Sequence, residues 1–354
     1  MPDHWVLFVG IAEVPFDHFE DGTESIGGAP LNVNVHAHQL AAAIGGGEGI
    51  VVSRVGEDSA GARLLDSPRG CGMAVDCTGF DPEHATGCVT VSLANSEPAY
   101  HIAPDPAWDY LVGIPSPIKL AAVCDAVCFG SLAQRTIFSR CTIQYFLAAA
   151  ASAISVFDVN RPVNPVTGQK YFDPQVLETG CDLAHIIKPN CSEPIALSHL
   201  LEIAPPGDVN ERRIRFLAGA LLARFPARAI VTRGQLGTVL FTRENEVTAP
   251  VPTGPVEVRP VGAGDACSAE FLVALMLGWD DRNAVDLANR MWARLASHVS
   301  ALHRCPGRFS ITSVRNYASS IHSDRCRCGV VGERRGLRRN LSTPVSFLAE
   351  DKLD

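Results

Sequence analysis

Short apolar runs alternate with longer amphipathic stretches along most of the chain. A short apolar run is typical of a buried strand, and apolar residues that recur every three or four positions are typical of a helix. The predicted strands lie at residues 5–9, 49–55, 126–130, 154–159, 185–188 and 229–232, and the predicted helices include residues 32–44, 138–152 and 211–224. This alternation predicts an α/β fold, with a mostly parallel central sheet and helices on both faces. Ligands bind such sheets at the carboxyl ends of the strands.

One segment has a different pattern. Apolar and polar residues alternate over residues 89–94, and a turn at 95–98 leads into a second apolar stretch. Such alternation predicts a hairpin with one polar face. We interpret it as part of a small β lid formed by about residues 13–30 and 86–110. An exposed hairpin edge can pair with a second copy, so a homodimer through the lid is a further expectation.

The C-terminal end of the chain lacks this organisation. Residues 1–310 carry the pattern of one α/β domain, whereas residues 311–354 have little periodicity and become rich in arginine. We expect this extension to be loosely ordered. A nucleic-acid-binding arm is an alternative, and we favour a solvated extension over it.

The composition argues against several classes of protein. Hydrophobic residues make up 47% of the chain and charged residues 19%, as in globular proteins with a buried core. The formal net charge of -8 argues against a nucleic-acid partner. The apolar runs are too short for a membrane span, and the N-terminus lacks the pattern of a secretory signal. The 12 cysteines are scattered, which favours small buried thiols in a cytoplasmic protein.

The strongest chemical signal is the run Gly262-Ala263-Gly264-Asp265, which precedes an apolar stretch at residues 266–277. A glycine-rich turn that enters a helix presents free N–H groups and the positive end of the helix dipole, which together bind anions. Asp265 in this turn can accept a proton from an attacking hydroxyl, whereas it would repel the pyrophosphate of a dinucleotide. The alternative interpretation makes Asp265 a structural helix cap.

This run resembles the signature of the ribokinase-like (PfkB) sugar kinases, and of their fructokinases in particular. Further segments resemble that family in the same order along the chain, at residues 13–17, 27–32, 53–58, 84–93, 129–132, 157–161, 188–193 and 232–237. The ordered set, which extends over about residues 5–300, is much more specific than one motif. The resemblance implies a ribokinase-like fold and ATP-dependent phosphorylation of a sugar hydroxyl, with fructose converted to fructose 6-phosphate.

The resemblance also implies a role for each matching residue. Asp265 would be the catalytic base, beside an anion hole formed by Gly262, Ala263 and Gly264. The sugar would contact Asp17, Gly28, Asn32 and Arg161. The residues that position Mg²⁺ through water, without binding it directly, would be Asn190 and Glu193. The nucleotide would contact Thr232, Gly234, Gly237 and Asn289.

Single residues have simpler interpretations as well. Asn32 could be a helix N-cap, Glu193 a surface acid and Arg161 a solvated loop charge. Two segments also depart from the family pattern. Arg259-Pro260 stands where the family has Asp-Thr, which helps to hold a monovalent cation, and a guanidinium there would oppose cation binding or replace it. The loop at 297–307 contains His298, His303 and Arg304 in place of small residues.

These departures keep other functions open. A kinase of another sugar or of a nucleoside would have the same fold. A non-catalytic binding or regulatory protein derived from a kinase would explain the departures, but the intact glycine-rich turn and Asp265 argue against it. A dehydrogenase is a more distant alternative, and the chain lacks the glycine-lysine run of P-loop kinases.

Overall fold

The computed structural model describes residues 5–44, 46–94, 97–112, 117–160, 171, 173–191, 193–203, 210–225, 227–252 and 262–295. Several predictions concern residues outside these ranges. They are the sugar contact of Arg161, the departures at 259–260 and 297–307, and the loosely ordered extension at 311–354.

In the described part of the chain, nine strands form the central sheet, in the spatial order β13-β12-β11-β10-β9-β8-β1-β4-β5. Their bounds are β1 Val6–Ile11, β4 Gly47–Gly56, β5 Thr78–Asp81, β8 Ala126–Gly130, β9 Ile154–Asp158, β10 Ile186–Lys188, β11 Arg228–Thr232, β12 Thr238–Phe241 and β13 Glu246–Thr248. Neighbouring strands are parallel from β5 to β11, and β12 is antiparallel to both of its neighbours. The prediction of a mostly parallel sheet is confirmed.

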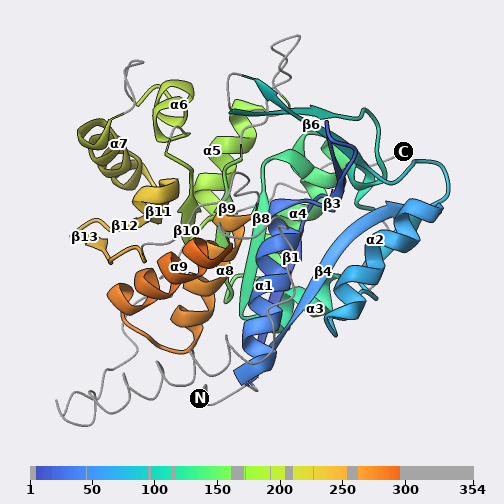
Figure 1. The fold of residues 1–354 in the computed structure, drawn as a ribbon, viewed down its shortest axis with the longest axis horizontal. Helices are drawn as coiled ribbons and strands as arrows, with labels where there is room; N and C mark the ends of the chain where they lie inside the picture. Colours follow the sequence, from blue (N-terminus) through green and yellow to red (C-terminus); the bar gives the residue numbers. More distant parts are fainter. Residues whose placement is uncertain are drawn as a thin grey trace, which may run out of the picture.

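Helices cover both faces of this sheet (Figure 1). The first face carries α1 Ala29–Ile44, α2 Ser59–Gly70, α8 Ala263–Met276 and α9 Asp281–Leu295. The second face carries α3 Pro117–Val123, α4 Ile137–Ala149, α5 Pro174–Leu183, α6 Glu193–Leu200 and α7 Glu211–Arg224. Short 3₁₀ helices lie at η1 Ala107–Tyr110, η2 Leu132–Gln134 and η3 Gly234–Leu236. Because these strands are buried on both faces of the sheet, their sequences are continuously apolar and do not alternate between apolar and polar residues.

The first face has α8 at its centre. The apolar stripe of α1, which includes Val33, Ala37 and Leu40, packs in one core cluster with α8, α9 and the strands. Because α8 has neighbours on several sides, its residues from Ala266 to Ala274 are all buried. This burial accounts for a helix that is apolar nearly all round.

A second sheet forms the predicted lid. Its strands, in the order β3-β2-β6-β7, are β2 Phe16–Phe19, β3 Glu24–Ile26, β6 Cys88–Ala94 and β7 Glu97–Ile102. Figure 1 shows this sheet at the end of the molecule toward which β4 points. Val89, Val91 and Ile102 of the lid pack on the fully buried Trp108, which joins the lid to the main domain. The lid therefore lies over the carboxyl ends of the parallel strands.

Two further observations concern the helices and the cysteines. None of the helices in the described ranges has both the length and the apolar character that a membrane span requires. The nine cysteines within those ranges are free thiols, and Cys124, Cys128, Cys181 and Cys267 among them are buried.

Candidate active site

Elements from distant parts of the chain meet around Asp265, in the first turn of α8. Asn32 of α1 donates a hydrogen bond from Nδ2 to Asp265 Oδ2, over 2.9 Å. Lys188 Nζ, at the end of β10, lies 3.5 Å from Asp265 Oδ1. The same ammonium lies 2.8 Å from Oδ2 of Asp158, the residue of β9 that is paired with Lys188 in the sheet. Both oxygens of Asp265 thus have a donor nearby and keep lone pairs for a further proton.

The N-terminus of α8 has the form of an anion site. Gly262 occupies the N-cap position with φ +80°, a left-handed conformation that favours glycine, and no side chain caps this helix end within the described residues. The first N–H groups of a helix have no partner in the preceding turn, so they point toward a ligand. Asp265 lies inside the helix and bonds to Asn32, so the interpretation of Asp265 as a helix cap is wrong.

Asp17 lies on the lid and is 8% exposed. A Cβ at Gly27 would overlap the Asp17 carboxylate, so a larger residue there would have to displace that carboxylate. Burial and then the negative charge of Asp265 raise the pKa of Asp17 to about 7. Among the described residues, the buried Oδ1 of Asn32 has no hydrogen-bond partner. Asp17 and Asn32 thus offer acceptors for hydroxyl groups close to Asp265.

Gly28 lies directly before α1. Its carbonyl oxygen accepts a hydrogen bond from the N–H of Asn32, so it belongs to the entry of the helix rather than to a free loop. Asn32 accordingly lies in the first turn and its side chain points to Asp265, which contradicts its alternative interpretation as an N-cap.

Asn190 and Glu193 bond to each other at the start of α6. The N–H of Asn190 donates to Glu193 Oε2 over 2.8 Å, and the N–H of Glu193 donates to Asn190 Oδ1 over 3.1 Å. Asn190 is also bridged to Thr232 of β11. Glu193 is buried, so the interpretation as a surface acid is wrong. In the part of the chain that the structure describes, no group of His, Cys, Asp or Glu side chains could hold a metal ion directly.

The residues predicted to contact nucleotide lie at the β11–β12 turn. Thr232 ends β11, and the N–H of Gly237 bonds to the carbonyl of Gly234 over 2.9 Å to close the turn. Asn289 of α9 is fully buried and supports this turn: Oδ1 accepts from the N–H of Thr238, and Nδ2 donates to the carbonyl of Ala249. The Asn289 amide thus fixes the backbone on both sides of this part of the chain. Contact between Asn289 and nucleotide stays a prediction.

Sequence reasoning assigned no role to three residues of this site. Lys188 and Asp158 are each a charged residue at the end of an apolar strand. That position was the one sign in the sequence that they belong to the site. Tyr100 lies opposite Val91, as Asp17 lies opposite Val89, so Tyr100 and Asp17 share one face of the lid. Burial, followed by the charges of Asp17 and Asp265, raises the pKa of Tyr100 to about 12.

Glu13 is a buried acid beside this site, 2% exposed, and its Oε2 has no partner among the described residues. Burial raises its pKa from the usual 4.5 to about 8, with a smaller contribution from the charge of Asp158. A carboxyl group whose pKa is raised by folding stabilises the protein below its unfolded pKa. That stabilisation is lost as the pH rises through the folded value.

We expect the free energy of unfolding to fall between about pH 5 and pH 9. One such proton contributes a slope of up to about 1.4 kcal/mol per pH unit. Glu13→Gln should reduce the slope by about one proton, as measured by denaturant unfolding at several pH values. The exposed Glu57→Gln is the control and should keep the wild-type slope. An unchanged slope in Glu13→Gln would show that Glu13 is ionised in the native protein.

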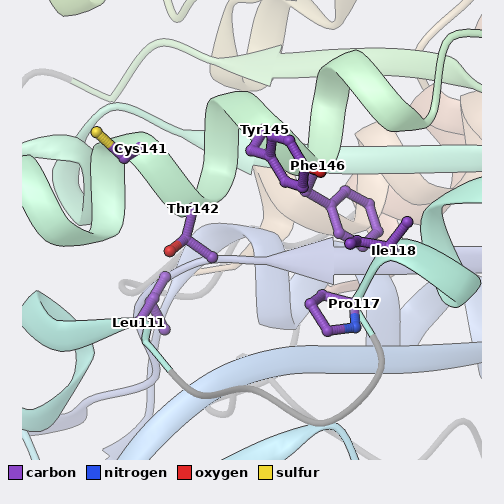
Figure 2. A pocket seen from close by; sticks show the side chains of 7 residues that line it. All are labelled: Leu111, Pro117, Ile118, Cys141, Thr142, Tyr145 and Phe146. Carbon is purple, nitrogen blue, oxygen red and sulfur yellow. The ribbon is translucent and has the colours of Figure 1, made fainter. Parts of the chain in front are cut away.

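A surface hollow elsewhere is separate from this site. It has a volume of about 430 Å³ and lies between η1, α3 and α4 on the second face of the sheet, opposite α8. Figure 2 shows its lining, which is mostly apolar: Leu111, Pro117, Ile118, Cys141, Thr142, Tyr145 and Phe146. The charged cluster around Asp265 does not contribute to it.

Known proteins resemble this chain along most of its length. The uncharacterized sugar kinase PH1459 of Pyrococcus horikoshii is 28% identical over 280 residues, which cover 78% of this chain and 79% of that protein. Its crystal structure in complex with ATP has a TM-score of 0.68, with 84% of this chain and 94% of that one covered.

Two solved structures with lower identity share the fold. A fructokinase from Vibrio cholerae with fructose, ADP and potassium bound has a TM-score of 0.70 at 19% identity, and the match covers 88% of this chain and 99% of that one. Aminoimidazole riboside kinase from Salmonella enterica, with its riboside and an ATP analog, has a TM-score of 0.69 at 22% identity, over 87% and 99% of the two chains.

A family model agrees with these likenesses. The model of the pfkB family carbohydrate kinases matches residues 5–301, which include the lid, the nine-stranded sheet and the glycine-rich turn before Asp265. The chain belongs to the pfkB carbohydrate kinase family.

Proposed function

We propose that this protein transfers the γ-phosphoryl group of ATP to a sugar hydroxyl, with Asp265 as the general base. The observation that supports this most is the Asp265 carboxylate in the first turn of α8, with Asn32 and Lys188 on its two oxygens. The proton acceptor and the free helix N-terminus therefore lie within one turn of each other. A hydroxyl between them would meet both a base and a group that stabilises negative charge.

The reaction needs little covalent chemistry from the protein. The sugar oxygen forms a bond to the γ-phosphorus, and its proton passes to Asp265. The bond between that phosphorus and the bridging oxygen breaks, and ADP leaves with the electron pair. The N–H groups of Ala263 and Gly264 would bind the oxygens of the transferred group, and Asn190 and Glu193 would hold Mg²⁺ through water. The lid would exclude water, which otherwise competes as acceptor.

We favour fructose as the substrate, with phosphorylation of its 6-hydroxyl. Asp17 and the unpaired Oδ1 of Asn32 are acceptors suited to a compact polyhydroxylated molecule. One observation favours a nucleoside instead: Phe19 and Tyr100 of the lid both lie opposite Val91 and pack against the same apolar cluster, and aromatic rings can stack on a base. Another sugar or nucleoside is therefore the second candidate.

A coupled assay of ADP release, run over a panel of sugars and nucleosides, tests the function. We expect turnover with fructose well above the rate without acceptor. A folded protein that binds ATP and phosphorylates no member of the panel would instead be a non-catalytic relative.

A separate prediction concerns monovalent cations. Because Arg259-Pro260 replaces the Asp-Thr of the family signature, we expect little activation by K⁺. Rates should agree within about twofold between K⁺ and Na⁺ at constant ionic strength, since a guanidinium repels a cation. A steep rise with K⁺ would mean that other groups form the cation site.

A further inference from the structure

Lys188 is a buried cation at the centre of the site. It ends β10, and Ile186, two residues earlier, packs in the core cluster that contains α8. Alternate residues of a strand share a face, so Lys188 also faces α8. Its Nζ lies 2.8 Å from Asp158 Oδ2 and 3.5 Å from Asp265 Oδ1. The ammonium therefore lies between the carboxylate of Asp265, the proposed base, and the carboxylate of Asp158.

Within the described residues, Asp158 and Asp265 accept two hydrogen bonds from this ammonium. An ammonium has three N–H donors, and a buried one is costly unless its donors have partners. A Cβ on Gly264 would lie 3.8 Å from Nζ and 4.0 Å from the hydroxyl oxygen of Thr232. The glycine leaves that space open. Nζ, the Thr232 hydroxyl and the first turn of α8 thus border one region.

Several negatively charged groups surround the Lys188 ammonium. Asp17, Asp158 and Asp265 are three carboxyl groups in a small volume, and an incoming triphosphate would add more negative charge. Burial by itself would lower the pKa of Lys188, but Asp158 and Asp265 raise it above its ordinary value. The ammonium therefore stays charged at neutral pH, where it offsets the repulsion between the carboxylates and the phosphates.

We propose that Lys188 is a catalytic residue that donates a hydrogen bond from Nζ to the transferred phosphoryl group, and that Asp158 is the positioning residue that aims it. The inference rests on the function proposed above. Backbone N–H groups at a helix end supply partial charges, whereas an ammonium supplies a full one. Lys188 would stabilise the charge on the phosphoryl oxygens and keep the base close to them.

The test compares binding of ATP and ADP, because only ATP carries the group that Lys188 would touch. Calorimetric titration should show that Lys188→Met weakens ATP binding more than ADP binding, so that the preference for ATP falls at least about tenfold. kcat with the best sugar should also fall at least about tenfold. Lys188→Arg should retain more of both, since it keeps the charge. An unchanged ATP-to-ADP ratio in Lys188→Met would overturn the inference.

A double variant separates catalysis from stability. Lys188→Met alone leaves Asp158 buried and unpaired, which lowers the melting temperature, whereas Lys188→Met with Asp158→Asn removes the pair as a unit and should recover it. We expect the double variant to stay low in kcat and in ATP preference. Recovery of these two quantities together with stability would assign Lys188 a structural role only. If Lys188→Met alone does not fold, the double variant still allows kcat and the ATP preference to be measured.

A matched pair far from the site provides the control. Arg228 begins β11, at the end of the strand opposite Thr232, and pairs with Asp281 of α9 over 2.9 Å. Arg228→Met with Asp281→Asn should leave the ATP-to-ADP ratio and kcat unchanged. The binding measurement also separates this inference from the proposed function. If the wild-type protein binds ATP but phosphorylates no sugar, the proposed function fails, and the binding ratio of Lys188→Met still decides the inference.

Discussion

Asp265→Asn should lower kcat at least about a hundredfold, which is the low end for the loss of a general base. The amide keeps the size of the carboxylate and can still accept from Asn32, but it cannot take the proton of the sugar hydroxyl. The first turn of α8 and its N-cap Gly262 are unchanged, so ATP should bind with nearly the wild-type affinity. Steady-state kinetics and calorimetric titration with ATP measure the two quantities.

A control variant shows whether any loss is specific to the site. Asp286 of α9 pairs with Arg290 over 2.7 Å on the same face of the sheet, away from the lid. Asp286→Asn keeps the size of this buried side chain and can still accept from Arg290, so kcat should stay within about twofold of the wild-type value. Wild-type turnover in Asp265→Asn would mean that Asp265 is not the base, and the proposed mechanism would be wrong.

Fructose should be preferred over adenosine by orders of magnitude in kcat/KM. A site built to hydrogen-bond hydroxyls rejects ligands that leave its polar groups unpaired, and the factor can reach about 10⁴. Asp17 is buried on the lid, so a substrate without a hydroxyl opposite it would leave a polar group without a partner. Comparable values for the two substrates would contradict the assignment to fructose and leave the kinase fold intact.

Asp17→Ala should remove most of that preference. Loss of the carboxylate removes the acceptor for a sugar hydroxyl, so kcat/KM for fructose falls, while adenosine is affected less. The control is Asp21→Ala, in the exposed turn between β2 and β3, where Asp21 bonds to Thr23. The ratio of kcat/KM values should be unchanged in that variant. An unchanged ratio in Asp17→Ala would place sugar recognition elsewhere.

Much of the fold could be predicted because its elements have strong periodic signals. The apolar stripe of α1 appears in the sequence with helical spacing, and the strand at residues 126–130 is continuously apolar because it is buried on both faces. The lid strands β2 and β3 are short and contain charged residues, so their extended form depends on the pairing of β2 with β6 and of β3 with β2. Local sequence could not reveal that pairing.

The candidate site could be predicted only in part. Asp265 is recognisable because its neighbours Gly262 and Gly264 make a rare local pattern. Lys188 and Asp158 are ordinary charges after apolar strands, and their pairing results from the register of β9 and β10. Register is a property of the assembled sheet, so no local motif in the sequence reports it.

The packing of α8 against α1 has a consequence for synthesis. The ribosome makes residues 29–44 early, but the helix that covers their apolar stripe begins at Ala263. At ordinary elongation rates the interval is on the order of 10 to 45 s. During that time the nascent chain lacks the helix that covers this stripe in the folded domain. The phosphoryl-transfer site is likewise incomplete until Asp265 has emerged, so a truncated chain that ends before α8 would lack the proposed base.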